Sequence, residues 1–351
     1  VRLHPGAQPR GPPPAGDLNT VGPTDSNNSR LPRVAVVGPT ATGKSDLALD
    51  LADRTRADDP TRRAEIINAD ASLLYRGMDI GTAKPSPAER DRVPHHQIDV
   101  LAVTERASVA AFQRSARSDI NAVESRGGLP IIVGGSGLYV RALTDGLDFP
   151  GTDPAVRTRL SERAEQEGTP ALYAELAGLD PVAAERIEAS NTRRIVRALE
   201  VIEITGRPFS ASLPRYEDVA PTVHIALRCE RRLLDARINA RARAMFERGL
   251  VEEVETLIDQ GLRRGETAPR AIGYAQALAV IDGTISVPEA IAATALATRQ
   301  LASRQIKWFR RDPRVRWIDV DLAEDGRCTD AERSRVTRQA WEHVLASHGV
   351  A

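Results

Sequence analysis

Cysteine, lysine and long apolar runs are all scarce in this chain of 351 residues, and each shortage excludes a class of protein. The two cysteines, Cys229 and Cys328, fit neither a disulfide framework nor a metal-binding spacing, which indicates a reducing cytoplasm. No apolar run approaches the ~20 residues that a membrane-spanning helix needs. The formal net charge is zero, so any contact with nucleic acid must depend on local arginine clusters.

Only three of the 48 basic residues are lysines, namely Lys44, Lys84 and Lys307. Lysine carries a compact point charge, whereas the charge of arginine is flat and delocalised. In a chain that otherwise uses arginine, lysine can therefore mark a place where a compact charge is needed. Chance is the competing explanation for so small a set, although all three lysines fall in segments with recognisable motifs.

The composition, 41% hydrophobic and 27% charged, is that of a soluble globular protein with a sizeable core. Residues 1–32 differ from the rest, because they contain seven prolines and four glycines and few apolar residues. Such a segment buries too little surface to offset the entropy lost on ordering, so it is predicted to be a disordered extension. It lacks the apolar stretch of a signal peptide.

Short apolar runs that end in glycine-rich or acidic turns recur along the chain, at residues 34–37, 65–68 and 129–133. Strands that alternate with helices in this way predict an α/β fold, with a parallel sheet flanked by helices as in phosphate-loop NTPases. Ligands bind at the carboxyl ends of such strands. The three turns are therefore expected to meet at one site.

The remaining segments indicate how the chain is divided. The core is expected in two parts, residues 33–150 and 219–322, separated by a helical insertion domain at 151–218 that is rich in Ala, Glu and Arg. Residues 323–351 are expected to form a C-terminal helical tail. Within the second part of the core, the patterns predict strands at 223–227 and 315–320 and long helices at 232–260 and 287–310.

The turn after the first run matches the phosphate-loop pattern G-x-x-x-x-G-K-[ST]. Glycines let backbone amides surround phosphate oxygens, Lys44 neutralises the outer phosphate, and the hydroxyl of Ser45 can ligate Mg²⁺. An ordinary glycine-rich turn is the alternative, but this motif also follows a strand and opens a helix, whose positive end favours an anion. The predicted diphosphate- or triphosphate-binding residues are Gly38, Pro39, Thr40, Ala41, Thr42, Gly43, Lys44 and Ser45.

Asp70 follows the second run and is expected to face the phosphate loop. A carboxylate in this place can hold Mg²⁺ or remove a proton from an acceptor, and it can equally cap the next helix. Spacing alone leaves these interpretations open. The turn-rich segment 75–85 downstream has the composition of a functional loop, and His95 and His96 are interpreted as hydrogen-bonding residues because no third metal ligand lies at a suitable spacing.

Taken together, the motifs of residues 33–320 resemble the bacterial tRNA dimethylallyltransferases in order and spacing. The resemblance rests on the phosphate loop, Asn68-Ala69-Asp70, the segment 75–85, Pro94-His95-His96, Gly134-Gly135-Ser136-Gly137-Leu138-Tyr139, residues 193–200, Ile272-Gly273-Tyr274, and the segment from Thr298 to Phe309. It implies transfer of a dimethylallyl group from dimethylallyl diphosphate to the exocyclic N6 amine of the adenosine 3′ to the anticodon. The expected substrates are tRNAs that read codons beginning with U.

The resemblance also implies roles for individual residues. Asp70 would be the general base, Arg241 and Lys44 would stabilise the leaving diphosphate, and Mg²⁺ at Ser45 would be the cofactor. Arg237 and Arg241 lie one helical turn apart, although two such arginines are otherwise typical of a solvated basic face. Arg304, Lys307 and Arg311 form a similar stripe beside Trp308, again with a solvated face as the alternative. The protein is expected to be a cytoplasmic monomer.

Residues implied to contact the tRNA anticodon stem-loop come from five places in the chain. Arginines on a helix suit contacts to phosphates that position the RNA without reading its sequence. The set comprises Asp70, Ala71, Ser72, Leu73, Ser136, Arg157, Arg193, Arg194, Ile195, Val196, Arg197, Arg270, Ala271, Ile272, Gly273, Tyr274 and Ala275. Ala71, Ser72 and Ser136 depart from the common family residues, which affects details of the RNA contact and not the reaction.

Two other classes of function compete with this interpretation. A small-molecule or nucleotide kinase would share the phosphate loop, the sheet and Mg²⁺, but it would not need the arginine-rich insertion; a prenyltransferase acting on free AMP or ADP would not need it either. A nucleotide switch or RNA-binding protein without chemistry is the second class. The guanine-reading Asn-Lys-x-Asp sequence of GTPases is absent from the chain, which weighs against a switch.

Overall fold

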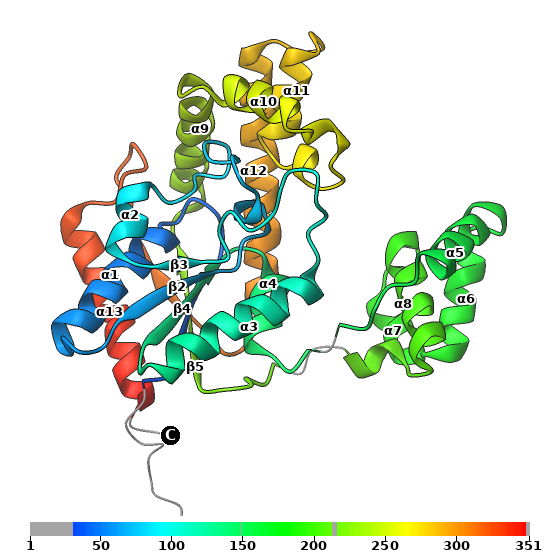
Figure 1. The fold of residues 1–351 in the computed structure, drawn as a ribbon, viewed down its shortest axis with the longest axis horizontal. Helices are drawn as coiled ribbons and strands as arrows, with labels where there is room; N and C mark the ends of the chain where they lie inside the picture. Colours follow the sequence, from blue (N-terminus) through cyan, green and yellow to red (C-terminus); the bar gives the residue numbers. More distant parts are fainter. Residues whose placement is uncertain (1–30, 148, 213–215, 349–351) are drawn as a thin grey trace, which may run out of the picture. The chain divides into compact units, whose positions relative to one another are not determined.

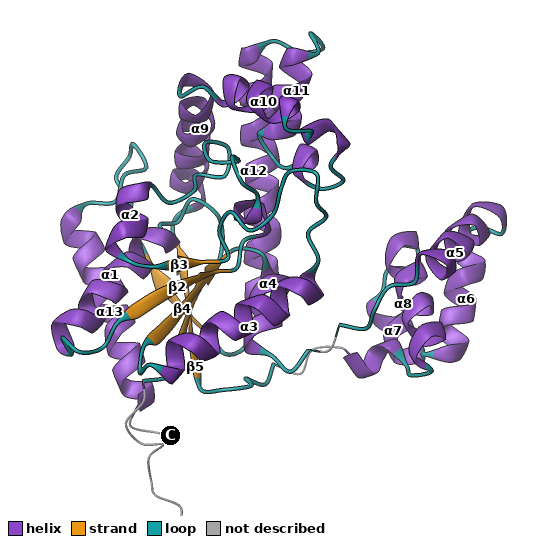
Figure 2. Cartoon of the chain, in the orientation of Figure 1, coloured by secondary structure: helices purple, strands orange, loops and turns teal. Residues whose placement is uncertain are grey.

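The computed structural model describes residues 31–147, 149–212 and 216–348. In this part of the chain, a sheet of six parallel strands runs in the order β3-β2-β4-β1-β5-β6 (Figure 2). The strands are β1 (Arg33–Val37), β2 (Ala64–Asn68), β3 (His95–His96), β4 (Leu129–Gly134), β5 (Thr222–Arg228) and β6 (Val315–Asp319). The predicted parallel α/β sheet is confirmed, with β1 between β4 and β5.

The inner strands are buried on both faces, which explains their nearly continuous apolar sequences. Successive residues of β1 contribute to opposite cores, Val34 and Val36 to one and Ala35 and Val37 to the other. The five strands predicted from apolar runs agree with the observed strands to within one residue at each end. Sequence analysis does not predict β3, because two residues are too few to show a period.

Helices cover both faces of the sheet (Figure 1). On one face, α1 (Lys44–Asp58) and α13 (Asp330–His348) pack against each other and against the strands. On the other face lie α3 (Val109–Ser125) and α4 (Gly137–Thr144). None of the helices in the described ranges is both long enough and apolar enough to cross a bilayer.

A third apolar cluster joins the segment around Tyr75 and Met78 to a further group of helices. The helices of this group are α9 (Arg231–Glu247), α10 (Leu250–Asp259), α11 (Tyr274–Ile281) and α12 (Val287–Phe309), with the 3-10 turns η4 (Leu262–Arg264) and η5 (Ala268–Arg270). The short helix α2 (Pro87–Arg92) precedes β3 and has a complete capping box, Ser86 with Glu89.

The single helix predicted over 232–260 is wrong, because α9 and α10 are separate helices. Gly249 adopts a φ of 94°, a left-handed conformation that glycine reaches without strain and that interrupts helical hydrogen bonding. The helix predicted over 287–310 is confirmed by α12, within one residue at its end.

The helices between β4 and β5 have an apolar cluster of their own, in which Leu160, Leu172 and Ile195 are fully buried. They are α5 (Pro154–Gln166), α6 (Thr169–Leu179), α7 (Pro181–Arg186), α8 (Thr192–Thr205) and the 3-10 turn η3 (Phe209–Ser212). Prolines in the first turns of α5, α6 and α7 explain where these helices begin. The disorder predicted for residues 1–32 falls outside the described residues, apart from Leu31 and Pro32.

Candidate active site

The phosphate loop connects β1 to α1 and turns through left-handed backbone conformations. The φ angles are 114° at Gly38, 65° at Ala41 and 95° at Gly43. A non-glycine residue with positive φ is costly, and such conformations gather at ligand sites. Inside the loop, Thr42 Oγ1 and Lys44 Nζ both donate to the carbonyl of Pro39, at 2.9 and 2.7 Å.

Lys44 is partly buried at the start of α1, and no carboxylate of the described residues is in hydrogen-bond contact with it. Burial lowers the pKa of its ammonium group to about 8, since the charged form loses hydration; the nearby charge of Asp70 opposes this shift and that of Arg241 adds to it. An anion with several negative oxygens, placed in the loop, would supply the missing counter-charge. The site is therefore built for a ligand more highly charged than the single carboxylate of Asp70.

The turns after β1, β2 and β4 meet, as predicted. Gly134 lies so close to the second turn that a Cβ added there would be 2.3 Å from the carbonyl oxygen of Ala69. A Cβ on Gly135 would be 3.2 Å from the carbonyl oxygen of Gly38. The backbone amide of Ala71 donates to Ser136 Oγ at 3.3 Å. Glycine is required at Gly134 because the backbones themselves touch there.

Asp70 caps the short 3-10 helix η2 (Ala71–Leu74), so the capping interpretation is confirmed. Its Oδ1 accepts from the amide and the hydroxyl of Ser72, at 3.4 and 3.1 Å, and from the hydroxyl of Ser136 at 3.4 Å. Among the described residues none donates a hydrogen bond to Oδ2. The cap thus orients the carboxylate through one oxygen and leaves the other available to a ligand.

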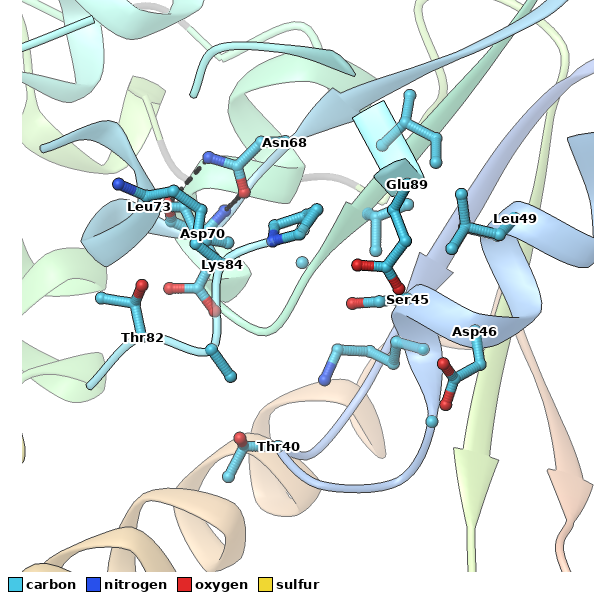
Figure 3. A pocket seen from close by; sticks show the side chains of 18 of the residues that line it. Thr40, Ser45, Asp46, Leu49, Asn68, Asp70, Leu73, Thr82, Lys84 and Glu89 are labelled. Carbon is cyan, nitrogen blue, oxygen red and sulfur yellow. Dashed lines mark hydrogen bonds between the residues drawn. The ribbon is translucent and has the colours of Figure 1, made fainter. Parts of the chain in front are cut away.

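Two cavities meet at this carboxylate. The first, of about 290 Å³, contains the phosphate loop and extends over α1 towards Glu89 and His95 (Figure 3). The second, of about 330 Å³, lies between the segment 70–82, the helices α9 and α12, and the turn around Arg270. The residues that line both cavities are Thr40, Asp70, Thr82 and Arg241. The shared wall thus contains a carboxylate and a guanidinium.

Arg241 projects from α9 into this wall. Its Nη2 donates to the carbonyl of Thr82 at 3.4 Å, and burial lowers the pKa of its guanidinium while the charge of Asp70 acts in the opposite direction. One turn earlier, Arg237 lines the first cavity, and its Nη1 is buried with no hydrogen-bond partner among the described residues. The two arginines, interpreted from sequence alone as a solvated face, are therefore directed inwards.

Lys84 is a structural residue, in contrast to Lys44. Its buried ammonium donates to Asp79 and Asp99 at 2.5 and 2.6 Å and to the carbonyl of Tyr75 at 2.9 Å. These bonds fold the segment 75–85 into a compact wall of both cavities. The histidines form hydrogen bonds, as predicted, His95 to the carbonyl of Val93 and His96 to Glu65.

The described residues contain no cluster of three or more His, Cys, Asp or Glu side chains arranged to hold a metal ion. A Mg²⁺ ion bound together with a phosphorylated ligand keeps several waters and takes substrate oxygens in place of a full set of protein ligands. Ser45 and Asp46 provide oxygen atoms at the phosphate loop (Figure 3). The donor set is therefore compatible with Mg²⁺.

The residues implied to bind tRNA that lie outside α5 and α8 fall into three groups in the structure. Those in the second cavity or on its wall are Asp70, Ala71, Ser72, Arg270, Ala271 and Ile272. Leu73 lines the first cavity, and Ser136 contacts Asp70 and Ala71. Gly273, Tyr274 and Ala275 start α11, where Tyr274 is fully buried and donates to Glu253 at 2.5 Å. The ring of Tyr274 thus lies in the core, and the tRNA contact implied for residues 273–275 stays a prediction.

The implied residues on α5 and α8 also divide into buried, paired and exposed side chains. The side chains of Ile195 and Val196 are buried in the apolar cluster of the insertion, and the tRNA contacts implied at these two positions stay predictions. Arg157 and Arg197 both pair with the fully buried Glu200, at 2.5 and 2.8 Å. Arg193 and Arg194 are exposed and form no ion pair within the described part of the chain. Of these four arginines, Arg193 and Arg194 are therefore available to bind an anion outside the protein.

Sequence analysis misses three residues that build the site. Thr82 lines both cavities, Glu253 accepts from the amide of Ile80 at 2.8 Å as well as from Tyr274, and Gln305 on α12 bonds the phosphate loop. Glu253 lies on a helical pattern without a motif. Gln305 falls within the segment from Thr298 to Phe309 that carries the resemblance, but the sequence assigns it no role. Thr82 lies within the segment 75–85, whose turn-rich composition does point to a functional loop.

Comparison with known sequences gives a consistent result. Residues 73–312 match the sequence model of the family described as IPP transferase. A protein of Kineococcus radiotolerans named tRNA dimethylallyltransferase is 56% identical over 295 residues, which are 84% of this chain and 93% of the relative. A protein of the same name from Streptomyces coelicolor is 55% identical over 294 residues, covering 84% of this chain and 92% of the relative.

Solved structures are similar over most of their length. The full-length tRNA isopentenylpyrophosphate transferase from Bacillus halodurans has a TM-score of 0.63 and 36% identity, and the alignment covers 92% of this chain and 99% of that one. A eukaryotic dimethylallyltransferase acting on tRNA has a TM-score of 0.69 at 24% identity, covering 82% and 73%. The second likeness concerns the fold alone.

Proposed function

The chain belongs to the IPP transferase family, and from this membership we propose that it transfers a dimethylallyl group from dimethylallyl diphosphate to the N6 amine of the adenosine 3′ to the anticodon, in tRNAs that read codons beginning with U. The observation that carries the proposal is the wall shared by the two cavities. One cavity suits a diphosphate and the other suits a flat base, and a carboxylate and a guanidinium lie between them.

The donor and the acceptor occupy different cavities in this proposal. The diphosphate lies in the phosphate loop against Lys44, with its C1 carbon directed at the shared wall. The adenine leaves its stack, at a cost of a few kcal/mol, and enters the second cavity between Ser72 and Ile272. Its amine then faces Asp70 from the side opposite the leaving group.

The transfer step forms one bond and breaks one. The nitrogen lone pair attacks C1 as the C1–O bond breaks, and the electrons of that bond leave with the diphosphate. The proton of the amine passes to Oδ2 of Asp70, which removes the positive charge that would otherwise develop on nitrogen. Lys44 and Arg241 stabilise the leaving anion at the place where its charge develops.

Mg²⁺ would be held by Ser45 together with diphosphate oxygens, and it would add positive charge beside the leaving group. Arg193 and Arg194 would contact phosphates of the anticodon stem-loop. We also propose a cytoplasmic monomer. A kinase is less suitable, because the matching family is that of the IPP transferases and the similar proteins are named tRNA dimethylallyltransferase.

The activity is tested by incubating the protein with Mg²⁺, dimethylallyl diphosphate and unmodified bacterial tRNA, followed by mass spectrometry of the digested nucleosides. A dimethylallyl adduct on adenosine supports the proposal. ATP replaces the prenyl donor in a parallel reaction. If no tRNA gains the adduct and ATP phosphorylates a small molecule instead, the chain is a kinase. Free AMP as acceptor distinguishes a prenyltransferase that needs no RNA.

The affinity for dimethylallyl diphosphate is expected to fall as the pH rises above about 8. The charged form of Lys44 binds the anion, and burial lowers the pKa of this group to about 8 in the free protein. Above that pH the group must gain a proton on binding, so the dissociation constant should rise by up to about tenfold per pH unit. Calorimetric titration without tRNA measures this. The Lys44→Met variant should bind dimethylallyl diphosphate weakly at every pH, without a further fall in affinity above about pH 8. If its affinity falls there as in the wild type, another group is responsible for the titration.

Alanine at both Arg193 and Arg194 is expected to weaken tRNA binding and reduce its salt dependence. Each phosphate contact that is lost should lower the slope of log affinity against log salt by about 0.7–0.9. Filter binding over a series of salt concentrations measures the slope. Arg163→Ala is the control, because this arginine of the insertion pairs with Glu167 and Glu175 and is not among the residues implied to bind tRNA, so it should leave the slope unchanged. An unchanged slope in the double variant would mean that α8 does not contact RNA.

A further inference from the structure

Gln305 is a buried polar residue that the proposed reaction does not use. It lies on α12, with 6% of its surface exposed, and its side-chain amide makes two hydrogen bonds to backbone groups. Its Oε1 accepts from the amide of Thr40 at 2.8 Å, and its Nε2 donates to the carbonyl of Gly135 at 3.0 Å. One side chain thus joins the phosphate loop to the turn after β4.

The contact is close enough to be specific for an amide. A Cβ on Gly135 would lie 2.2 Å from Nε2 of Gln305, so the glutamine fits directly against the glycine backbone. A carboxylate in its place could accept from Thr40 but could not donate to Gly135, and an apolar residue could do neither. Each backbone group left unpaired in this buried place costs about 1–3 kcal/mol.

The two segments that Gln305 joins carry the two halves of the site. Thr40 lies beside Ala41, whose positive φ is supported by apolar packing against Ile238 of α9 and Ala302 of α12. Gly135 precedes Ser136, whose hydroxyl is 3.4 Å from Oδ1 of Asp70. A continuous series of contacts therefore leads from the phosphate loop through the glutamine to the carboxylate.

We propose that Gln305 is a positioning residue for the transfer step, which sets the separation between the leaving diphosphate and Asp70. The proposal rests on the function proposed above. The reaction needs the amine, C1 and the leaving oxygen in line, and a displacement of about 1 Å can lower a rate about 100-fold. Binding of the diphosphate depends mainly on Lys44 and the loop amides. Loss of Gln305 should therefore affect the rate of transfer more than the affinity for the donor.

The test compares single-turnover rates and donor affinities of Gln305→Leu and Gln305→Glu with those of the wild type, using an anticodon stem-loop and Mg²⁺. Gln305→Leu should lower the rate of transfer about 10–100-fold and change the dissociation constant of dimethylallyl diphosphate far less. Gln305→Glu should regain activity relative to the wild type as the pH falls, because a protonated carboxyl can again donate to Gly135. A residue that only stabilises the fold would not produce this pH dependence.

Gly135→Ala provides an independent variant, since the added methyl group must displace the amide of Gln305. It should reproduce the loss of rate, and in the Gln305→Leu background it should add little further loss, because both changes break the same contact. Gln113→Leu is the matched control. Gln113 also donates to two backbone carbonyls, those of Ala142 and Leu147, both at 2.9 Å, but it lines neither cavity. It should lower the melting temperature and keep the rate.

Three results would overturn the positioning role. Gln305→Leu could keep the wild-type single-turnover rate, or it could lose only thermal stability, as Gln113→Leu does. It could also bind the donor more tightly, which would mean that Gln305 merely competes with phosphate for the amide of Thr40. A wild-type protein that transfers nothing to any tRNA would refute the proposed function instead, so the two failures are distinguishable.

Discussion

Asp70→Asn is expected to lower the single-turnover rate of dimethylallyl transfer about 10²–10⁴-fold, the usual contribution of a general base. Asparagine has nearly the same shape and can still accept the hydrogen bonds that cap η2, but it cannot take the proton of the amine. The fold and the affinity for dimethylallyl diphosphate should therefore remain close to those of the wild type. Rapid-quench measurement with enzyme in excess gives the rate of the step.

Asp70→Ser separates the capping role from the chemical one, because serine is also a good cap. It should melt near the wild-type temperature and be as slow as the asparagine variant. A variant of Asp70 that keeps more than a tenth of the wild-type rate would show that the amine loses its proton to water or to another group. The carboxylate would then be a structural residue, consistent with its bonds to Ser72 and Ser136.

Arg241→Ala is expected to lower the rate of transfer about 10²–10³-fold, the range found when one preorganised donor to a developing anion is removed. The guanidinium is buried on the shared wall, and it makes a single hydrogen bond of 3.4 Å to Thr82 among the described residues. Its remaining donors are therefore available to the leaving group. Arg241→Lys should recover part of the loss by restoring charge without the flat fork of donors.

Kinetic constants decide what Arg241 does. A fall in the rate at saturating donor indicates stabilisation of charge that develops in the transition state, whereas a rise in KM alone would indicate ordinary binding of the diphosphate. Arg263→Ala is the control, because this exposed arginine pairs with Asp282 at 2.6 Å and lies on neither cavity wall. It should leave the rate unchanged.

The fold was largely predictable because the signals for it are local. All the described strands except β3 follow from short, mainly apolar runs, and a phosphate loop has a fixed spacing of glycine, lysine and serine. The rule that ligands bind at the carboxyl ends of parallel strands then predicts that Asp70 and the loop meet. The break at Gly249 was not predicted, since a glycine in a helical pattern shows its φ only in the structure.

The contacts made by individual charged residues could not be predicted in the same way. Nothing in the sequence distinguishes the four arginines Arg157, Arg193, Arg194 and Arg197 from one another. In the structure, the buried Glu200 pairs with Arg157 and Arg197, whereas the other two are exposed. Lys44 and Lys84 are two of the three lysines in the chain, so their rarity does not distinguish them. In the structure, three oxygen acceptors, two of them carboxylates, surround Lys84, whereas Lys44 donates to the carbonyl of Pro39. Gln305 is far from Thr40 and Gly135 along the chain, so no window of sequence contains the contact.

The position of β1 in the sheet has a consequence for the synthesis of the protein on the ribosome. Among the strands in the described part of the chain, β1 is made before the others, but one of its two neighbours, β5, follows the helices of the insertion. Until Thr222–Arg228 has emerged, one edge of β1 has unpaired amide and carbonyl groups that could join another nascent chain. The insertion has an apolar core of its own and can fold during this interval. Closing the long connection costs little extra entropy, because that cost grows only with the logarithm of its length.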